Sequence, residues 1–337
     1  MSREANIEAI GPRAEPADTP ELAPAAGAAI RLDQYGRSQR KQRSLWGNAW
    51  RQFRRHKLAM AGMVVFALFT LVTFLGPVIY GEKVNAPFAY SSGLTPSSDH
   101  WMGTDSLGQD MMARILWGGR ISIAVGLVAA LISVVLGTLV GAIAGFFGGA
   151  ADSILMRITD MFISLPQLPL LLLITFLFKD SLVRFFQSTF GSGNFGVFFM
   201  IVVVIGLLAW MSTARLVRAS FLSVKEKEFV EAARSMGATR GSLMFRHILP
   251  NVMSPIIVAA TLEVGAAIIT ESALSFLGLG FPSNVPTWGR MLFEAKDYFE
   301  FSPHQALFPG MMIFLTVLAI NYMGDGLRDA LDPRKTQ

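Results

Sequence analysis

The sequence predicts an all-α protein that is embedded in a membrane and crosses it six times. Of its 337 residues, 52% are hydrophobic and 16% are charged, with a mean hydropathy of +0.47, which is more apolar than an ordinary soluble domain. Several apolar stretches reach the roughly 20 residues that a helix needs to cross a bilayer. They are rich in Gly and Phe and lack a regular two-residue alternation, which favours helices over a β-barrel.

The expected spans follow one another along the chain and leave both ends on the same side. An N-terminal stretch of over forty mainly polar residues precedes the first span and is too long for a typical cleaved signal peptide, so we expect this span to be retained. With the N-terminus inside, most of the Lys and Arg residues fall on the inner side, which predicts cytoplasmic ends. The spans cover residues 58–80, 121–147, 162–178, 195–210, 252–279 and 307–323.

The parts before the second span have distinct compositions. Residues 1–43 are rich in Ala, Pro, Glu and Gly and are expected to form a disordered cytoplasmic tail. In residues 44–80, an amphipathic helix with Trp46, Trp50 and Phe53 on one face is expected to lie in the headgroup region and to lead into the first span.

The segment 81–119 is expected to lie outside the membrane, with Asp105 capping a helix that runs towards Trp117. The core then covers residues 120–325, including a cytoplasmic loop at 215–250, and a cytoplasmic tail covers 326–337. In the second span, Gly137, Gly141 and Gly145 form a stripe for close helix packing.

The loop at 215–250 is the most charged internal stretch, and its pattern is helical. Ser223 and Glu226 have the spacing of a capping box, and Gly237 is a typical helix stop, so a helix of about 20 Å is expected over 224–236.

One face of that expected helix is apolar, and it admits two interpretations. Phe229, Ala232, Ala233 and Met236 recur at i, i+3, i+4 and i+7, while Glu228, Glu231 and Arg234 lie off this face. The face could enter the groove of a protein partner, or it could pack on its own subunit.

Two acids, Glu263 and Glu271, lie in the apolar fifth span, eight residues apart and roughly on one face. Ionisable groups inside a bilayer are costly, so they are candidates for a translocation path or gate. Alternatively, each is paired with a neighbouring helix or lies near the outer interface. Pro166, Pro169 and Pro255 could kink the third and fifth spans, or reflect irregular packing.

The remaining sequence features exclude several kinds of site. The chain has no cysteine, and its four histidines are scattered, so neither a disulfide framework nor a metal motif is expected. No phosphate-binding loop, His-Glu-x-x-His or Gly-x-Ser-x-Gly pattern occurs, so no catalytic residue or bound cofactor is expected. Topology explains the net charge of +5 better than nucleic-acid binding does. The segment 280–306, which carries Trp288, is expected to be an outer loop.

Several motifs resemble those of binding-protein-dependent ABC importer permeases. Glu231-Ala232-Ala233, three residues, Gly237, nine residues and then His247-Ile248-Leu249-Pro250 are similar to the EAA motif of that family. His247 replaces the usual aliphatic residue, as in the peptide and nickel branch. Further similar segments are Gly103-Thr104-Asp105-Ser106-Leu107-Gly108-Gln109-Asp110, Gly119-Arg120-Ile121-Ser122, Ser275-Phe276-Leu277-Gly278-Leu279-Gly280 and Gly324-Asp325-Gly326-Leu327-Arg328-Asp329-Ala330-Leu331-Asp332-Pro333.

This resemblance covers most of the chain after Ser44 and is greatest to the C-type second permease subunit of oligopeptide and dipeptide importers. It implies a type I ABC importer permease (MetI-like) architecture in the bacterial inner membrane, with segment 81–119 in the periplasm. The implied cargo is a dipeptide, an oligopeptide or a related small substrate, with nickel complexes and glutathione-like compounds left open.

The resemblance also implies partners and a coupling helix. Partner ATPase subunits, two in number and cytoplasmic, would use ATP and Mg, and a second homologous permease and a periplasmic or lipid-anchored substrate-binding protein would complete the importer. The implied ATPase-coupling helix comprises Phe229, Glu231, Ala232, Ala233, Arg234, Met236 and Gly237.

Two rival functions remain open at this point. A proton-coupled secondary transporter would use Glu263 and Glu271 as a relay, but no pair of inverted, interrupted repeats is evident in the sequence. A passive membrane scaffold would explain the spans but would leave the two intramembrane acids unexplained.

Overall fold

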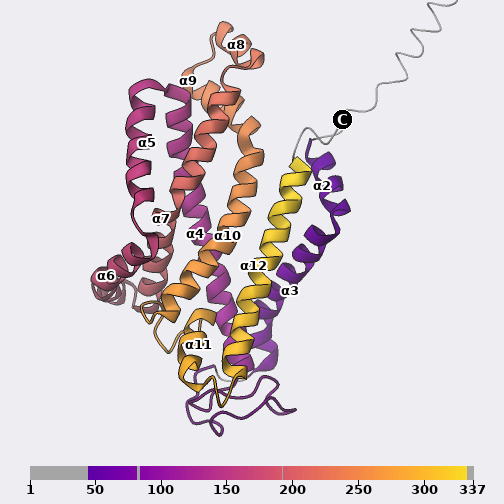
Figure 1. The fold of residues 1–337 in the computed structure, drawn as a ribbon, viewed down its shortest axis with the longest axis vertical. Helices are drawn as coiled ribbons and strands as arrows, with labels where there is room; N and C mark the ends of the chain where they lie inside the picture. Colours follow the sequence, from indigo (N-terminus) through magenta and orange to yellow (C-terminus); the bar gives the residue numbers. More distant parts are fainter. Residues whose placement is uncertain (1–44, 82–83, 192, 332–337) are drawn as a thin grey trace, which may run out of the picture. The chain divides into compact units, whose positions relative to one another are not determined.

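The computed structural model describes residues 45–81, 84–191 and 193–331, which form helices and no strand. The expected tail at 1–43 lies outside the described residues. Apart from Leu45, the described residues belong to one compact unit, Trp46–Gln337, whose helices are drawn in Figure 1. In chain order they are α2 (Leu45–Arg55), α3 (Lys57–Tyr80), α4 (Met111–Phe147), α5 (Gly149–Ser164), α6 (Gln167–Phe190), α7 (Gly193–Val224), α8 (Glu228–Ser235), α9 (Arg240–Ser242), α10 (Met253–Phe276), α11 (Trp288–Ala295) and α12 (His304–Leu331).

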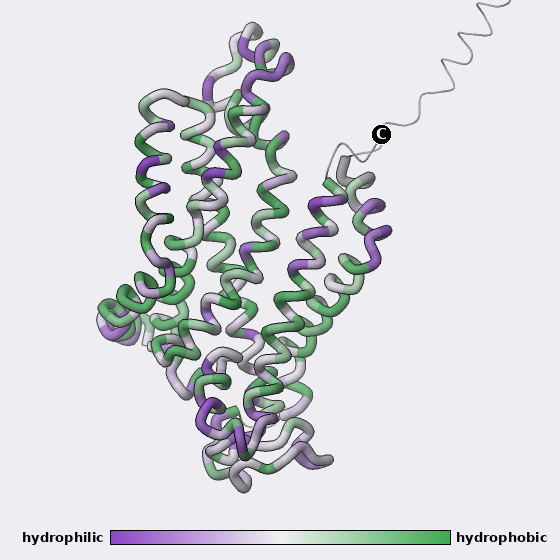
Figure 2. The backbone as a smooth tube through the Cα atoms, viewed as in Figure 1, coloured by the Kyte–Doolittle hydropathy of each residue, from purple (hydrophilic) through white to green (hydrophobic). Residues whose placement is uncertain are grey.

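Five helices are long and apolar enough to cross a membrane, and a bent pair brings the possible number to six. The five are α3, α4, α7, α12 and the run from Arg240 to Phe276 that contains α10. Figure 2 shows hydrophobic residues along the middle of these helices and hydrophilic residues gathered towards their ends. The all-α membrane fold predicted from the sequence is therefore confirmed.

The third expected span is broken, although the sequence predicts a single stretch at 162–178. α5 and α6 meet at an angle of 87°. Leu165 adopts an extended conformation and Pro166 caps α6, because a residue before proline avoids the helical region and proline has no N–H to donate. Pro169 and Pro255 lie in the first turns of α6 and α10, where the missing N–H costs no α-helical hydrogen bond. Within the run from Arg240 to Phe276, Pro255 follows a π-helix at Leu243–Ile248 and a 3-10 helix at Leu249–Val252, so irregular helix geometry lies just before it.

The glycine stripe in α4 packs against α7, as the sequence predicts. A Cβ atom on Gly141 would lie 2.4 Å from the backbone oxygen of Ala214. At Gly145 it would lie 2.6 Å from Cβ of Phe221. Only glycine permits this approach, so α4 and α7 form the closely packed centre of the bundle.

The expected cap at Asp105 is wrong, because α4 begins later and continues without a break into the second span. Its cap is Asp110, whose Oδ1 accepts from the Ala113 N–H at 2.9 Å. Asp105 lies in the preceding loop, where Oδ1 accepts from two backbone N–H groups at 2.8 Å. Its other oxygen pairs with the buried Arg114 of α4, which also binds Glu294 of α11 at 2.7 Å. Tertiary pairing thus determines the role of Asp105.

The segment expected to be an outer loop at 280–306 contains a packed helix, α11. Trp288 at its start is fully buried, and its Nε1 donates to the backbone oxygen of Ile115 at 3.1 Å. In Figure 1, α11 lies at the opposite end of the bundle from α8. This segment therefore forms part of the folded core at that end.

The beginning and end of the described chain lie together. Phe53 of α2 is buried beside Gly326 of α12, and Gln52 Nε2 donates to the backbone oxygen of Asp329 at 2.9 Å. The half-exposed ring of Trp50 stacks on Phe53, whereas the side chain of Trp46 lies outside the described residues. α12 continues to Leu331, so the helix extends into the tail expected at 326–337.

Candidate functional site

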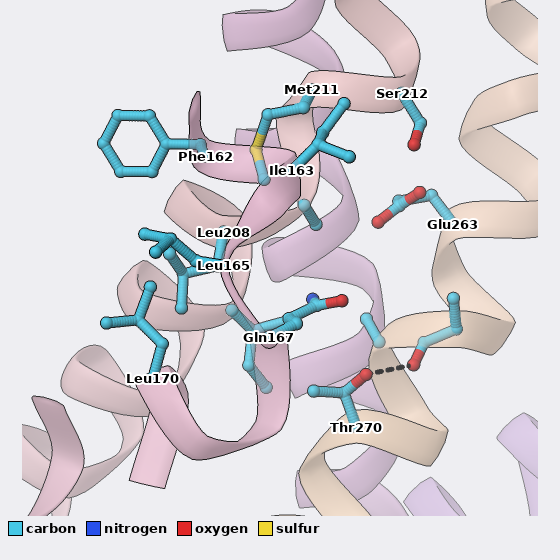
Figure 3. A pocket seen from close by; sticks show the side chains of 14 residues that line it. Phe162, Ile163, Leu165, Gln167, Leu170, Leu208, Met211, Ser212, Glu263 and Thr270 are labelled. Atoms are coloured by element: carbon cyan, nitrogen blue, oxygen red, sulfur yellow. Dashed lines mark hydrogen bonds between the residues drawn. The ribbon is translucent and has the colours of Figure 1, made fainter. Parts of the chain in front are cut away.

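A cavity of about 310 Å³ lies beside the break between α5 and α6. α7 and α10 complete its wall, so the break that Pro166 imposes opens towards two of the central helices. Figure 3 shows the side chains around it. They are Phe162, Ile163, Leu165, Gln167, Leu170, Ile205, Leu208, Ala209, Met211, Ser212, Glu263, Ala266, Ala267 and Thr270.

The cavity has a polar side and an apolar side. Ser212, Glu263 and Thr270 project from α7 and α10 on one side, and the Gln167 amide extends towards them from the start of α6 (Figure 3). The Thr270 hydroxyl donates to the backbone oxygen of Ala266 at 2.8 Å, which leaves its lone pairs available as acceptors. The arrangement can therefore hold a hydrogen-bond donor next to apolar groups.

Glu263 is half-buried, and no cation among the described residues lies within ion-pair distance of it. Ser133 of α4 is its polar neighbour, but the Ser133 hydroxyl is buried without a partner at hydrogen-bond distance. An acid at this depth is costly unless a positive group approaches it. Of the two acids singled out in the sequence, Glu263 is the one that lines the cavity.

Glu271 lies elsewhere, fully buried near the start of α11. Its Oε1 accepts from the hydroxyls of Ser275 at 2.7 Å and Thr287 at 2.9 Å, and its Oε2 from that of Ser122 at 3.4 Å. These donors belong to α10, to the cap of α11 and to α4. The position matches the alternative in which Glu271 is paired with neighbouring elements.

Replacing Glu271 by Leu is expected to lower the free energy of unfolding by about 2–3 kcal/mol, because buried hydroxyls lose their acceptor. Glu271→Gln keeps one acceptor oxygen and should cost about 1 kcal/mol. Thermal unfolding of the purified protein would measure both. Equal unfolding temperatures for Glu271→Leu and wild type, together with lost transport, would instead assign Glu271 to the path.

The helix expected over 224–236 is shorter at its start and ends as expected. α8 begins after Lys227 without a side-chain cap, and Ser223 belongs to α7, so the predicted capping box is wrong. α7 continues because its last turn is packed through Phe221 against the core. The end is confirmed: Gly237 has φ of +84°, and the Ala238 N–H bonds to the Ala233 oxygen at 3.1 Å, which is a Schellman cap.

The apolar face predicted for this helix is divided between two sides. Ala233 is buried together with Val230, which sequence reasoning missed, in a cluster with Phe221 of α7. Phe229 is 43% exposed and Met236 is 81% exposed. Ala232, Glu231, Arg234 and Gly237 are exposed as well. α8 is therefore anchored on one side to its own chain and presents an open apolar strip, Phe229, Ala232 and Met236, on the other.

Two polar contacts brace the bundle below α8, and neither was predicted. Arg218 of α7 forms a bidentate ion pair with Asp152 of α5, in which Nη2 donates to Oδ2 at 2.6 Å. Lys225 Nζ donates to the backbone oxygen of Gly145 in α4 at 3.2 Å. Local sequence patterns could not reveal partners that are 66 and 80 residues apart.

Among the described residues, no group of three His, Cys, Asp or Glu could hold a metal ion.

Family models match two parts of the chain. Residues 137–337 match the model described as "Binding-protein-dependent transport system inner membrane component". Residues 44–96 match the model for the N-terminal TM domain of oligopeptide transport permease C.

Several curated proteins are similar over nearly their whole length. The glutathione transport system permease protein of Pectobacterium atrosepticum is 40% identical over 87% of this chain and 92% of its own. The oligopeptide transport system permease protein of Bacillus subtilis is 37% identical over 88% of this chain and 92% of its own. The dipeptide transport system permease protein of Alkalihalophilus pseudofirmus is 36% identical over 86% of this chain and 90% of its own.

A solved structure supports the fold. An inward-facing form of the MetNI methionine ABC transporter contains a chain that is similar with a TM-score of 0.52. The match covers 66% of this chain and 98% of that chain. Because the two sequences are only 19% identical, the similarity supports the arrangement of the helices and nothing more.

Proposed function

The chain belongs to the family of binding-protein-dependent transport system inner membrane components, and from this we propose that it carries peptides through a path shared with a second permease. It is a multi-pass permease subunit of an ABC importer in the inner membrane. The proposal of a peptide cargo rests on its relatives, whose names give oligopeptides, dipeptides and glutathione, itself a tripeptide, as cargo.

ATP hydrolysis is assigned to separate ATPase subunits, which α8 contacts as the coupling helix. The open strip of α8 supports this assignment, because Phe229, Ala232 and Met236 are exposed among the described residues and an apolar helix face favours a protein groove. Glu231 and Arg234 flank the strip and can form charge-assisted contacts at its rim. ATP and Mg bind to the partner chains, and this chain converts their closure into helix movement.

The complete importer has a second homologous permease, two cytoplasmic ATPases and a periplasmic or lipid-anchored substrate-binding protein. α8 and both chain ends face the cytoplasm, where Lys and Arg are concentrated, and α11 faces the periplasm. Glu263 lines the path through the broken span. Glu271 braces the outer gate, since its hydroxyl partners join α4, α10 and the start of α11.

The proposal is tested by purifying the tagged chain from native membranes and identifying the proteins that accompany it. An ATPase subunit is expected to co-purify with the wild type. Met236→Asp should reduce its recovery about fivefold, because a charge is placed within the apolar strip. Ser235→Asp adds the same charge one residue off the strip and should reduce recovery less than about twofold. Absence of any ATPase with the wild type would favour the proton-coupled transporter instead.

A further inference from the structure

We propose that the cavity at the α5–α6 break binds the terminal ammonium group of a peptide, with Glu263 as its counter-ion. This inference rests on the proposed peptide cargo and assigns the recognition of one chemical group to one place in the path. Its evidence is the charge, the hydrogen-bond acceptors and the shape of the cavity.

The charge of the cavity favours a cation. Glu263 is the only ionisable side chain among the residues that line it, and no described cation pairs with it. Glu271 is the contrasting case, because three hydroxyls already occupy its oxygens. The carboxylate of Glu263 is thus the acid whose charge remains available to a ligand.

The cavity has enough hydrogen-bond acceptors for an ammonium group. An ammonium has three N–H donors and no acceptor. The Glu263 carboxylate can take one donor, and the Gln167 amide oxygen and the hydroxyls of Ser212 and Thr270 lie on the same side of the cavity (Figure 3). A bare divalent cation is a poorer match, since it requires several oxygen ligands and usually more than one carboxylate.

The opposite side of the cavity suits the side chain that accompanies a peptide's amine. Phe162, Leu165 and Leu170 lie there (Figure 3). The volume of about 310 Å³ is at the small end of small-molecule sites, so the cavity holds the first residue or two of a peptide. It therefore recognises the N-terminal end and leaves the remaining length free in the path.

The test uses the absence of cysteine from the natural chain. A single Ala266→Cys substitution places a thiol in the cavity, three residues from Glu263. In membrane vesicles that contain the complete importer, the thiol is modified by a trimethylammonium-ethyl or a sulfonato-ethyl methanethiosulfonate. The ratio of the cationic to the anionic rate should fall about fivefold when Glu263→Gln is added, because the local negative charge is lost. An unchanged ratio overturns the proposal.

The ligand is then tested in the same vesicles. Trialanine should slow modification of the Ala266→Cys thiol at least about threefold, N-acetyl-trialanine should not, and Glu263→Gln should abolish the difference. Equal protection by the two peptides overturns the proposal. Gly241→Cys, at an exposed position with open space around its Cβ, is the matched control and should respond to neither peptide nor Glu263→Gln. If Ala266→Cys misfolds, Ala209→Cys on α7 provides a second thiol at the cavity.

These outcomes are independent of whether the proposed function holds. Uptake of labelled trialanine by intact cells and co-purification of an ATPase test the importer assignment without reference to Glu263. Normal uptake with no charge dependence in the cavity rejects the ammonium site alone. Lack of uptake and of ATPase rejects the peptide-importer assignment, whatever the thiol chemistry shows.

Discussion

Replacing Arg114 by Met is expected to lower the free energy of unfolding by about 3–5 kcal/mol, the usual cost of leaving a buried charge without its partner. Arg114 is only 2% exposed and pairs with Asp105 and with Glu294. Glu294 would retain Arg290, with which it also pairs at 2.9 Å. Asp105, which is 5% exposed, would lose the one cation that pairs with it in the described part of the chain.

The measurement is the thermal unfolding midpoint of the purified protein, which Arg114→Met should lower by roughly 4–7 °C. Arg215→Met is the matched control, because Arg215 and Asp160 form a pair in which both side chains are about half exposed. Such exposed pairs contribute about 0–1 kcal/mol. Equal midpoints for the two variants would show that the buried network does not stabilise the end of the bundle that contains α11.

Replacing Gly237 by Val is expected to reduce peptide uptake at least about tenfold while leaving the protein in the membrane. Gly237 has φ of +84°, and a side chain in this left-handed region costs about 1–2 kcal/mol, more for a β-branched residue. No atom lies within 4 Å of a Cβ placed there, so the cost comes from the backbone alone. The cap that ends α8 would be lost, and the open strip would no longer be presented in one orientation.

Gly241→Val separates this effect from general damage to the loop. Gly241 lies four residues further on, also has open space around its Cβ position, and has no left-handed φ. Peptide uptake by the Gly241→Val variant should stay within about twofold of wild type. The readouts are uptake, ATPase activity stimulated by the binding protein, and the amount of chain in the membrane. Wild-type uptake and stimulated ATPase activity in Gly237→Val would contradict a coupling role for α8.

The features that the sequence predicted correctly depend on neighbouring residues. Apolar length predicted the spans, a four-residue glycine repeat predicted the close packing of α4, and Gly237 predicted the end of α8. Each follows from local backbone chemistry or helical periodicity. The bend at Pro166 was recognised only as a kink, because its angle depends on how α6 packs against α7.

The features that the sequence did not predict depend on distant partners. Asp110, and not Asp105, caps α4, because Asp105 pairs with Arg114, which Glu294 binds from the other side. The inner face of α8 includes Val230 because α8 packs on α7, which helical spacing alone cannot show. Glu263 and Glu271 lie in similar sequence surroundings, and only the folded helices distinguish the acid that lines a cavity from the acid surrounded by hydroxyls.

The contact between Gln52 and Asp329 determines the parity of the membrane crossings. A chain that returns to the end from which it started has crossed an even number of times. α3, α4, α7, α12 and the run from Arg240 to Phe276 are long and apolar enough for five crossings, and Gln52 donates to the backbone of Asp329, so an even count requires the bent pair α5–α6 to be the sixth. On that count, the broken helix is the element that brings α2 and the end of α12 to one side.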